Sequence, residues 1–354
     1  MGVKTAFFGS SLVSAYWNGA ATYYRGIIRC LDALGYRTTF YEPDAYGRQA
    51  HRDINDPEWA RVFVYENSVE GLSKALEDAK DADIIIKASG VGVFDEKLER
   101  LVLDIRKPGA RAVFWDVDAP ATLDRVHEDP RDPFRPLIPR YDFVFTYGGG
   151  DPVVKAYRSL GARSCVPVYN ALDPSTHFPV SPDKRFGCDL GFLGNRLPDR
   201  EMRVRDFFFG AASRLPERRF ILGGNGWDEP FLPNVHYLGH IYTVDHNAFN
   251  STANAVLNIN RESMARYGFS PPTRVFEAAG ASACVITDAW EGIGLFLEPG
   301  REVLVARNGD EVAEIVKALK PGEAAGIGRA AHERVMREHT YAQRARVVDA
   351  IFKG

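Results

Sequence analysis

The sequence predicts two α/β domains, each built on a doubly wound parallel sheet with helices on both faces. Three observations carry this prediction. Short apolar runs alternate with amphipathic stretches, which is the rhythm of repeated β-α units. The rhythm pauses between residues 170 and 184, where Pro174, Pro179 and Pro182 stand among polar residues, and then restarts. The length of 354 residues is too great for one ordinary core and suits two.

The first domain begins with a strand at Thr5 to Phe8, because this apolar run turns at once into Gly9-Ser10-Ser11. A helix from about Ala21 to Leu34 ends at Gly35. The strand Thr38 to Tyr41 then completes a β-α-β unit. Further strands are expected at Ile84 to Ala88, Ala112 to Trp115, Phe143 to Thr146 and Ser164 to Val168, with helices near Ser68 to Asp78, Glu96 to Arg106 and Pro152 to Leu160.

After the proline-bearing segment, which we interpret as the interdomain linker, the same alternation resumes. Its strands are expected at Leu190 to Leu193, Arg219 to Leu222, Val235 to Tyr237, Ala255 to Ile259 and Val285 to Thr287, with a helix from about Glu201 to Arg214 and helices at Glu311 to Leu319 and Gly328 to Phe352. We therefore expect domains at 1–170 and 171–335. A C-terminal helix at 336–354 is expected to pack back on the first domain.

Composition excludes several classes of protein. The 44 Lys+Arg residues against 47 Asp+Glu leave a net charge of −3, which gives no electrostatic case for nucleic acid. The four cysteines lie far apart and the eight histidines show no ligand spacing, so we expect no bound metal, cofactor or disulfide. No apolar window approaches the roughly 18–20 residues of a membrane span. The start does not resemble a signal peptide, so a cytoplasmic protein is expected.

The stretch from Asn258 to Asp288 is the most informative part of the chain. A strand leads into a polar loop that contains Pro271 and Pro272, and a helix follows. Ligands of open parallel sheets bind beyond the carboxyl ends of the strands, where helix N-termini offer unpaired N–H groups to anions. The loop 260–273 and the charges Arg274 and Glu277 are thus placed to hold a ligand.

Arg274 and Glu277 lie three residues apart, on one face of one helical turn. They could simply form an ion pair that stabilises the helix, or Glu277 could complement the helix dipole. Alternatively, the carboxylate could accept both hydroxyls of a ribose. Glycine turns after two strands, at Gly194-Asn195 with Arg200 nearby and at Gly223-Gly224, could admit a phosphate. Glycine also ends strands in any β/α fold, so both interpretations stay open.

In the first half, Asp116 and Asp118 follow a strand, so their carboxylates are expected at its carboxyl end. We expect that only one of the two need face a ligand. Turn-forming aspartates before Pro120 are the other interpretation. The loops with Asn18-Gly19 and Tyr147-Gly148 are expected at the same edge.

Several motifs together resemble one family over nearly the whole chain, the CgeB-type (spore-maturation-like) branch of the GT-B glycosyltransferases. The stretches that carry the resemblance are Trp17 to Gly26, Phe40 to Asp44 with His51 to Asp53, Trp115 to Pro120, Leu190 to Gly194, Tyr267 to Ala278, Trp290 to Gly292 and Glu298 to Glu302.

The resemblance implies two facing Rossmann-like domains, with an acceptor held mainly by the first, a nucleotide-sugar donor by the second, and a cleft between them. Glu277 looks like the family glutamate that binds the donor ribose, and Arg274 with Arg200 looks suited to the diphosphate. Many retaining relatives carry a second glutamate where this sequence has Phe269, so retention of configuration is not implied. The expected donor-binding residues are Gly194, Asn195, Arg200, Gly224, Asn260, Arg261, Tyr267, Ser270, Pro271, Thr273, Arg274 and Glu277.

We therefore expect a metal-independent transferase that moves a sugar from a nucleotide diphosphate, UDP most often in this fold, to an acceptor that is a glycan, a small molecule or a protein. Asp116 or Asp118 is the candidate base, and Asn18, Gly19, Tyr147 and Gly148 are the expected acceptor-side residues. The alternatives are a non-catalytic sugar-nucleotide-binding protein and a nicotinamide-dependent oxidoreductase. The latter is disfavoured because no GxGxxG follows the first strand.

Overall fold

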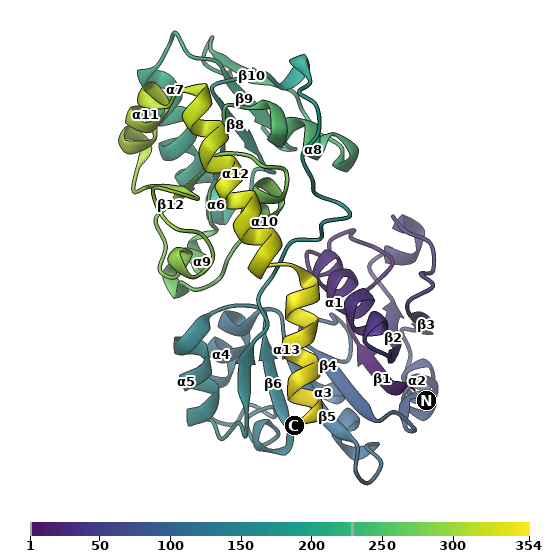
Figure 1. Ribbon diagram of the computed structural model, residues 1–354. Coiled ribbons are helices and arrows are strands. Elements are labelled where there is room, and N and C mark those ends of the chain that lie inside the picture. The colour runs from purple at the N-terminus through teal and green to yellow at the C-terminus, as the bar shows by residue number, and fades with distance from the viewer. Residues whose placement is uncertain (1, 228–229) are drawn as a thin grey trace. The chain divides into compact units, whose positions relative to one another are not determined.

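The chain folds into two compact units. A computed structural model describes residues 2–227 and 230–354 (Figure 1). Unit 1 comprises the chain up to Tyr169 together with Tyr341–Gly354, and unit 2 comprises Asn170–Thr340. The chain therefore passes from unit 1 to unit 2 and returns to unit 1 for its last helix.

Unit 1 contains, within the described residues, a seven-stranded parallel sheet of order β3-β2-β1-β4-β5-β6-β7. The order reverses direction at β1, as in doubly wound folds. The strands are β1 (Val3–Phe8), β2 (Tyr36–Asp44), β3 (Arg61–Glu66), β4 (Ile84–Ala88), β5 (Arg111–Asp116), β6 (Phe143–Thr146) and β7 (Cys165–Pro167). The helices are α1 (Ala21–Ala33), α2 (Val69–Ala79), α3 (Asp95–Asp104), α4 (Ala119–Glu128), α5 (Gly150–Ser159) and α13 (Tyr341–Lys353), with 3-10 turns η1 (Arg48–His51) and η2 (Ile138–Arg140).

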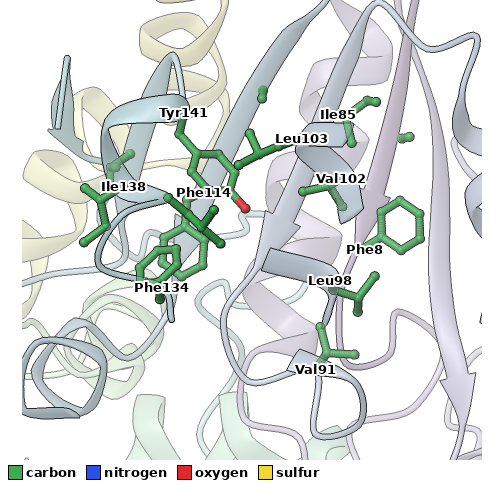
Figure 2. Packing of buried hydrophobic residues seen from close by; sticks show 14 of the residues in the cluster. Phe8, Ile85, Val91, Leu98, Val102, Leu103, Phe114, Phe134, Ile138 and Tyr141 are labelled. Carbon is green, nitrogen blue, oxygen red and sulfur yellow. The ribbon is translucent and has the colours of Figure 1, made fainter. Parts of the chain in front are cut away.

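The core of unit 1 follows from the two-residue period of its strands. Phe8, Ile85 and Phe114 point to the face covered by α2 to α5, where Figure 2 shows them among Leu98, Val102 and Tyr141. The Tyr141 hydroxyl is satisfied inside this core, donating to the Glu99 carbonyl at 2.6 Å.

The opposite face of the same sheet is covered by α1 and α13. The Phe7 ring lies 5.3 Å from that of Tyr24 on α1, and the Phe145 ring lies 5.7 Å from that of Phe352 on α13. Gly26 allows the two helices to approach closely, because a Cβ at this position would lie 2.2 Å from the Tyr341 ring. The last helix is thus part of the core of unit 1.

Unit 2 contains, among the residues described, a six-stranded parallel sheet of order β10-β9-β8-β11-β12-β13. One of its apolar clusters gathers side chains of the strands with those of α7, α11 and α12. The strands are β8 (Leu190–Leu193), β9 (Phe220–Gly223), β10 (Val235–Tyr237), β11 (Ala255–Asn258), β12 (Val285–Asp288) and β13 (Leu304–Ala306). The helices are α6 (Pro198–Val204), η4 (Arg205–Gly210), α7 (Ala211–Arg214), α8 (Thr243–Thr252), α9 (Glu262–Tyr267), α10 (Thr273–Gly280), α11 (Gly309–Ala318) and α12 (Pro321–Glu338), with 3-10 turns η3 (Lys184–Phe186) and η5 (Ile293–Leu295).

Several local features differ from the sequence-based expectations, among them the helix expected from Gly328 to Phe352, which is divided into α12 and α13. The strands β3 and β13, which lie at the edges of their sheets, were not predicted. The expected helix from Glu201 to Arg214 is interrupted by a π-helical segment, η4. Finally, residues 170–184 are not a free linker: the Asn170 amide donates to the Thr273 hydroxyl at 2.7 Å, and the Asp183 N–H donates to the Thr252 hydroxyl at 2.8 Å. These bonds fasten the proline-bearing segment to α8 and α10 of unit 2.

Candidate functional site

The glycine turns after β8 and β9 lie against each other at the carboxyl edge of the unit 2 sheet. The Gly194 N–H donates to the Gly223 carbonyl at 2.9 Å, and the Trp227 indole donates to the Gly194 carbonyl at 2.8 Å. Gly224 has φ +122°, and a Cβ there would lie 2.2 Å from the Gly194 carbonyl oxygen. Only glycine permits this approach, so the structure brings Gly194 and Gly224 together as one rigid edge.

Arg200 lies over this edge. Its Nη2 donates to the Asn195 carbonyl at 2.7 Å, and its guanidinium lies 5.6 Å from the Phe192 ring centroid. Burial and, to a smaller extent, the neighbouring cations Arg274 and Arg261 lower the pKa of Arg200 to about 10, while Asp199 acts in the opposite direction. Arg200 is therefore a partly desolvated cation in an electropositive environment.

Arg274 provides the second cation. It occupies the second position of α10, whose N-terminus faces the carboxyl edge of the sheet. Burial also lowers the pKa of Arg274, and the charge of Glu277 opposes that effect. Within the described residues Arg274 has no hydrogen-bond or ion-pair partner, so the predicted pairing with Glu277 is a field effect rather than a direct salt bridge.

Asn260 follows β11 at the same edge. Its backbone N–H donates to Asp288 at 3.1 Å, yet its side chain is 1% exposed and neither the amide nitrogen nor the amide oxygen has a partner in the described part of the chain. A buried amide without partners costs roughly 1–3 kcal/mol, so this side chain marks a position where a ligand atom would be favourable. The adjacent Arg261 pairs with Asp199 at 2.5 Å.

Glu277 lies one turn into α10, where two histidines accompany it. The His177 Nε2 lies 3.9 Å from a Glu277 carboxylate oxygen. The pKa of His246, on α8, is lowered chiefly by burial and then by Arg274, while Glu277 raises it. The His246 Nε2 lies 3.2 Å from the Ile241 carbonyl, which favours the tautomer with its proton on Nε2.

The loop between β11 and α10 forms a strained turn beside these residues. Phe269 has φ +47°, a left-handed conformation that is rare for an aromatic residue. Its N–H donates to the Glu291 carbonyl at 2.6 Å, and Gly292 leaves room for its ring. The next residues, Ser270 and Pro271, are buried. The Arg266 guanidinium lies 5.2 Å from the centroid of the Tyr267 ring.

In unit 1 the two candidate aspartates differ sharply. Asp116 is fully buried, and its carboxylate accepts from Ser89 at 2.7 Å, Thr122 at 3.1 Å, Tyr157 at 2.5 Å and the Asp118 N–H at 3.0 Å. Burial raises the pKa of Asp116, and these hydrogen bonds oppose that shift. Asp116 therefore holds the loop in place and does not present its carboxylate to solvent, whereas Asp118 is exposed.

The other acceptor-side candidates differ in how far they are buried and in what they contact. Asn18 is buried with its amide saturated: it donates to the Ser11 and Ser14 carbonyls at 2.8 and 2.9 Å and accepts from Ser10 at 2.8 Å. Asn18 thus holds the loop after β1 in place. A Cβ on Gly19 would meet open space. The Tyr147 ring contacts Tyr23 edge-on at 5.0 Å, and Gly148 beside it is buried.

Three residues near the candidate donor site were missed by sequence reasoning. His177, His246 and Asp288 come from a proline-rich segment, a helix and a strand end, and only the tertiary fold brings them to Glu277 and Asn260. No local pattern marks them. Asp288, buried with its carboxylate 2.6 Å from Arg203, supports the Asn260 loop.

Within the described residues, no three His, Cys, Asp or Glu side chains lie close enough together to hold a metal ion. No helix there combines the length and the apolar character needed to cross a membrane.

The family comparison concerns the second half of the chain. Residues 200–350 match a family described as glycosyl transferase-like. The match includes Arg200, Asn260, Arg274 and Glu277. No curated protein matches the sequence at a significant level.

Solved structures match over the whole length. Sucrose-phosphate synthase from Thermosynechococcus elongatus has a TM-score of 0.70 at 13% identity, covering 99% of this chain and 98% of that one. HepE from Anabaena, in complex with UDP and glucose, has a TM-score of 0.67 at 15% identity, covering 99% of both chains. The T4 phage protein BGT, in complex with UDP-glucose, has a TM-score of 0.60 at 14% identity, again covering 99% of both. The prediction of fold class is thus confirmed: the chain has the GT-B fold of two Rossmann-like domains, and its residues 200–350 are similar to a glycosyl transferase-like family.

Proposed function

We propose that the protein is a glycosyltransferase of the CgeB-type branch, which moves a sugar from a UDP-sugar held by unit 2 to an acceptor served by unit 1. The observation that carries the proposal is the pair Arg200 and Arg274. Both guanidinium groups are partly desolvated, and the charge of Arg274 lowers the pKa of Arg200. Two like charges in such a place destabilise the empty protein, and a diphosphate would compensate them.

Glu277 and Asn260 support a nucleotide-sugar rather than a simple anion. Glu277 stands one helical turn beyond Arg274, at a spacing that suits the ribose hydroxyls next to a diphosphate. The unpartnered Asn260 amide offers both a donor and an acceptor, which suits a sugar hydroxyl or a phosphate oxygen. Structural neighbours of the same fold bind UDP or UDP-glucose, which is why we choose UDP as the donor nucleotide.

In the proposed reaction an acceptor hydroxyl attacks the anomeric carbon of the donor. The bond between that carbon and the β-phosphate oxygen breaks, and UDP leaves with the additional negative charge. Arg200, Arg274 and the N–H groups of α10 would stabilise this charge. We therefore expect the reaction to need no bound metal. Asp118, the exposed aspartate on the loop that Asp116 holds, is the candidate that accepts the hydroxyl proton.

The experiment that tests the proposal compares Glu277→Gln with wild type. Gln keeps the size and helix propensity but removes the charge, so charge-assisted bonds of roughly 1.5–3 kcal/mol to the ribose are lost. The affinity for UDP should fall by about tenfold or more in a calorimetric titration. The matched control is Glu311→Gln, in the first turn of α11, which should bind UDP as wild type does.

If Glu277 only complements the dipole of α10, its variant should lose roughly 0.3–1 kcal/mol of stability and keep its UDP affinity. Melting curves on the same samples separate the two cases. An unchanged affinity in a folded Glu277→Gln protein would refute the donor site.

Phe269 favours a second candidate, a non-catalytic sugar-nucleotide-binding protein. An aromatic side chain, packed at Gly292, occupies the position where many retaining relatives carry a second glutamate. Release of free sugar from UDP-sugars, or transfer to any acceptor, would exclude this candidate.

A further inference from the structure

A cavity of about 560 Å³ opens at the amino-terminal edge of the unit 1 sheet. It is lined by the loop that precedes β5, by the first residues of β5 and β6, and by Arg163 before β7. Its volume falls within the roughly 300–1,000 Å³ of small-molecule sites. The candidate base Asp118 follows the opposite end of β5, about 17 Å away at roughly 3.3 Å per residue, so this cavity is separate from the proposed chemistry.

The charges that line the cavity are strongly unbalanced. Four cations, Arg106, Lys107, Arg111 and Arg163, line it together with one carboxylate, that of Asp142. A second carboxylate, Asp83, lies outside the lining and pairs with Lys107 at 2.8 Å. Even with Asp83 counted, cations exceed carboxylates by four to two.

Most of the hydrogen-bond donors of these arginines remain unused. Asp142 accepts from Arg106 at 2.7 Å and from Arg163 at 3.3 Å, while Arg111 donates to the Ile351 carbonyl at 3.1 Å and lies 5.6 Å from the Phe143 ring centroid. Each guanidinium has five N–H donors, and each of these three uses one within the part of the chain that the structure describes. Arg111 in particular has no carboxylate partner there.

We propose that this cavity binds a small phosphate-bearing anion. Arginine N–H pairs match phosphate oxygens in a bidentate manner, and several cations around one cavity suit a group with more than one negative charge. Asp142 orients Arg106 and Arg163 but also repels the anion, so the attraction for a doubly charged phosphate comes from the excess of cations. The ligand is a free phosphorylated molecule or the phosphate headgroup of a lipid, which share this chemistry.

The first experiment titrates inorganic phosphate into the full chain at low ionic strength, where ionic contacts are least screened. Arg163→Gln should weaken binding by about tenfold, since it removes one bidentate cation. The matched control is Arg61→Gln. Arg61 is also about 60% exposed and also pairs with an aspartate of unit 1, but it lies outside the cavity. The arginines of unit 2 also attract phosphate, and they are identical in all these proteins, so only differences between variants are interpreted.

The second variant should change the phosphate affinity in the opposite direction. Asp142→Asn removes the competing charge and should tighten phosphate binding by about fivefold, whereas the control Asp78→Asn, at the partner of Arg61, should leave it unchanged. Opposite shifts for Arg163→Gln and Asp142→Asn, with both controls like wild type, support the proposal. Equal affinity in wild type and folded Arg163→Gln, or the same shifts in the controls, would overturn it.

Cosedimentation with vesicles distinguishes the two sources of phosphate. The probes are phosphatidylcholine vesicles with and without phosphatidic acid. Binding that requires phosphatidic acid and is lost in Arg163→Gln assigns the cavity to a lipid headgroup. Phosphate binding without sedimentation assigns it to a free phosphorylated molecule. Sedimentation that Arg61→Gln reduces as much as Arg163→Gln would contradict a site in this cavity.

Discussion

The buried Asn260 side chain is expected to destabilise the unliganded protein and to bind a ligand. Its side chain is buried without partners, so Asn260→Leu, which keeps the volume, should raise the free energy of unfolding by roughly 1 kcal/mol and weaken UDP binding. The same change at Asn258 should act in the opposite direction on stability, because the Asn258 amide donates to the Thr287 hydroxyl at 3.0 Å. Urea denaturation and UDP titration of both variants provide the measurement. A destabilised Asn260→Leu protein would contradict this account.

His246 gives a prediction for the dependence of stability on pH. Burial lowers its pKa below the ordinary value of 6.5, so the unfolded chain binds a proton more readily than the folded one. The stabilising contribution of neutral His246 is therefore complete above pH 6.5, and it is lost as the pH falls from there towards the folded pKa. We expect this loss in wild type and its absence in His246→Gln. Chemical denaturation of both proteins between pH 5 and 8 checks it, and parallel curves would refute it.

The sequence located the residues whose position depends on local structure. Arg200, Arg274 and Glu277 follow a strand end or begin a helix, so their edge of the sheet could be predicted. A two-residue period would place Asp116 and Asp118 on the same side of a continuing strand. They differ in exposure because β5 ends at Asp116 and Asp118 lies in the turn before α4, which the sequence did not indicate. His177 and His246 depend on how α8 and the proline-rich segment pack on α10, and no local pattern encodes this packing.

The contact between α1 and α13 is the clearest test of helix packing in unit 1. Gly26→Ala places a Cβ 2.2 Å from the Tyr341 ring, so the helices must separate. Despite the roughly 1 kcal/mol gain in helix propensity, we expect a net loss of stability of about 1–3 kcal/mol. Gly322→Ala on α12 is the control, because its Cβ would meet no atom within 4 Å, and it should stabilise. Thermal melting of both variants decides, and a stabilised Gly26→Ala protein would contradict the packing.

The strands and helices differ in how clearly the sequence predicts them. Central strands such as β4, Ile84–Ala88, are buried throughout and show as apolar runs. The edge strand β3 is mostly exposed or half-buried, and β13 has three residues, so neither gives a clear period. The π-helical segment η4 has the composition of an ordinary helix, and the Cβ of any residue replacing Gly309 would lie 2.1 Å from its Asp206 carbonyl. That constraint comes from α11, which lies a hundred residues later.

At the scale of the whole molecule, the return of the chain to unit 1 predicts the effect of a truncation. A protein that ends at Thr340 lacks α13 and leaves one face of the unit 1 sheet uncovered around Phe143 and Phe145. We expect unit 1 to melt at a lower temperature, whereas unit 2, complete at Thr340, should keep its transition and its affinity for UDP. Calorimetric melting with and without UDP measures both. Loss of UDP binding alone would contradict the division.

The same return of the chain sets the order in which the protein can fold during synthesis. Although most of unit 1 is made first, α13, one of the helices that seal its sheet, is made only after unit 2. Unit 2 has all of its residues before unit 1 does, so the nascent protein carries an uncovered aromatic surface until α13 has been made. Such exposed surface is prone to aggregation and to chaperone binding. Completion of unit 1 therefore waits for the synthesis of unit 2, and a chain interrupted after Thr340 carries a complete unit 2 attached to an incomplete unit 1.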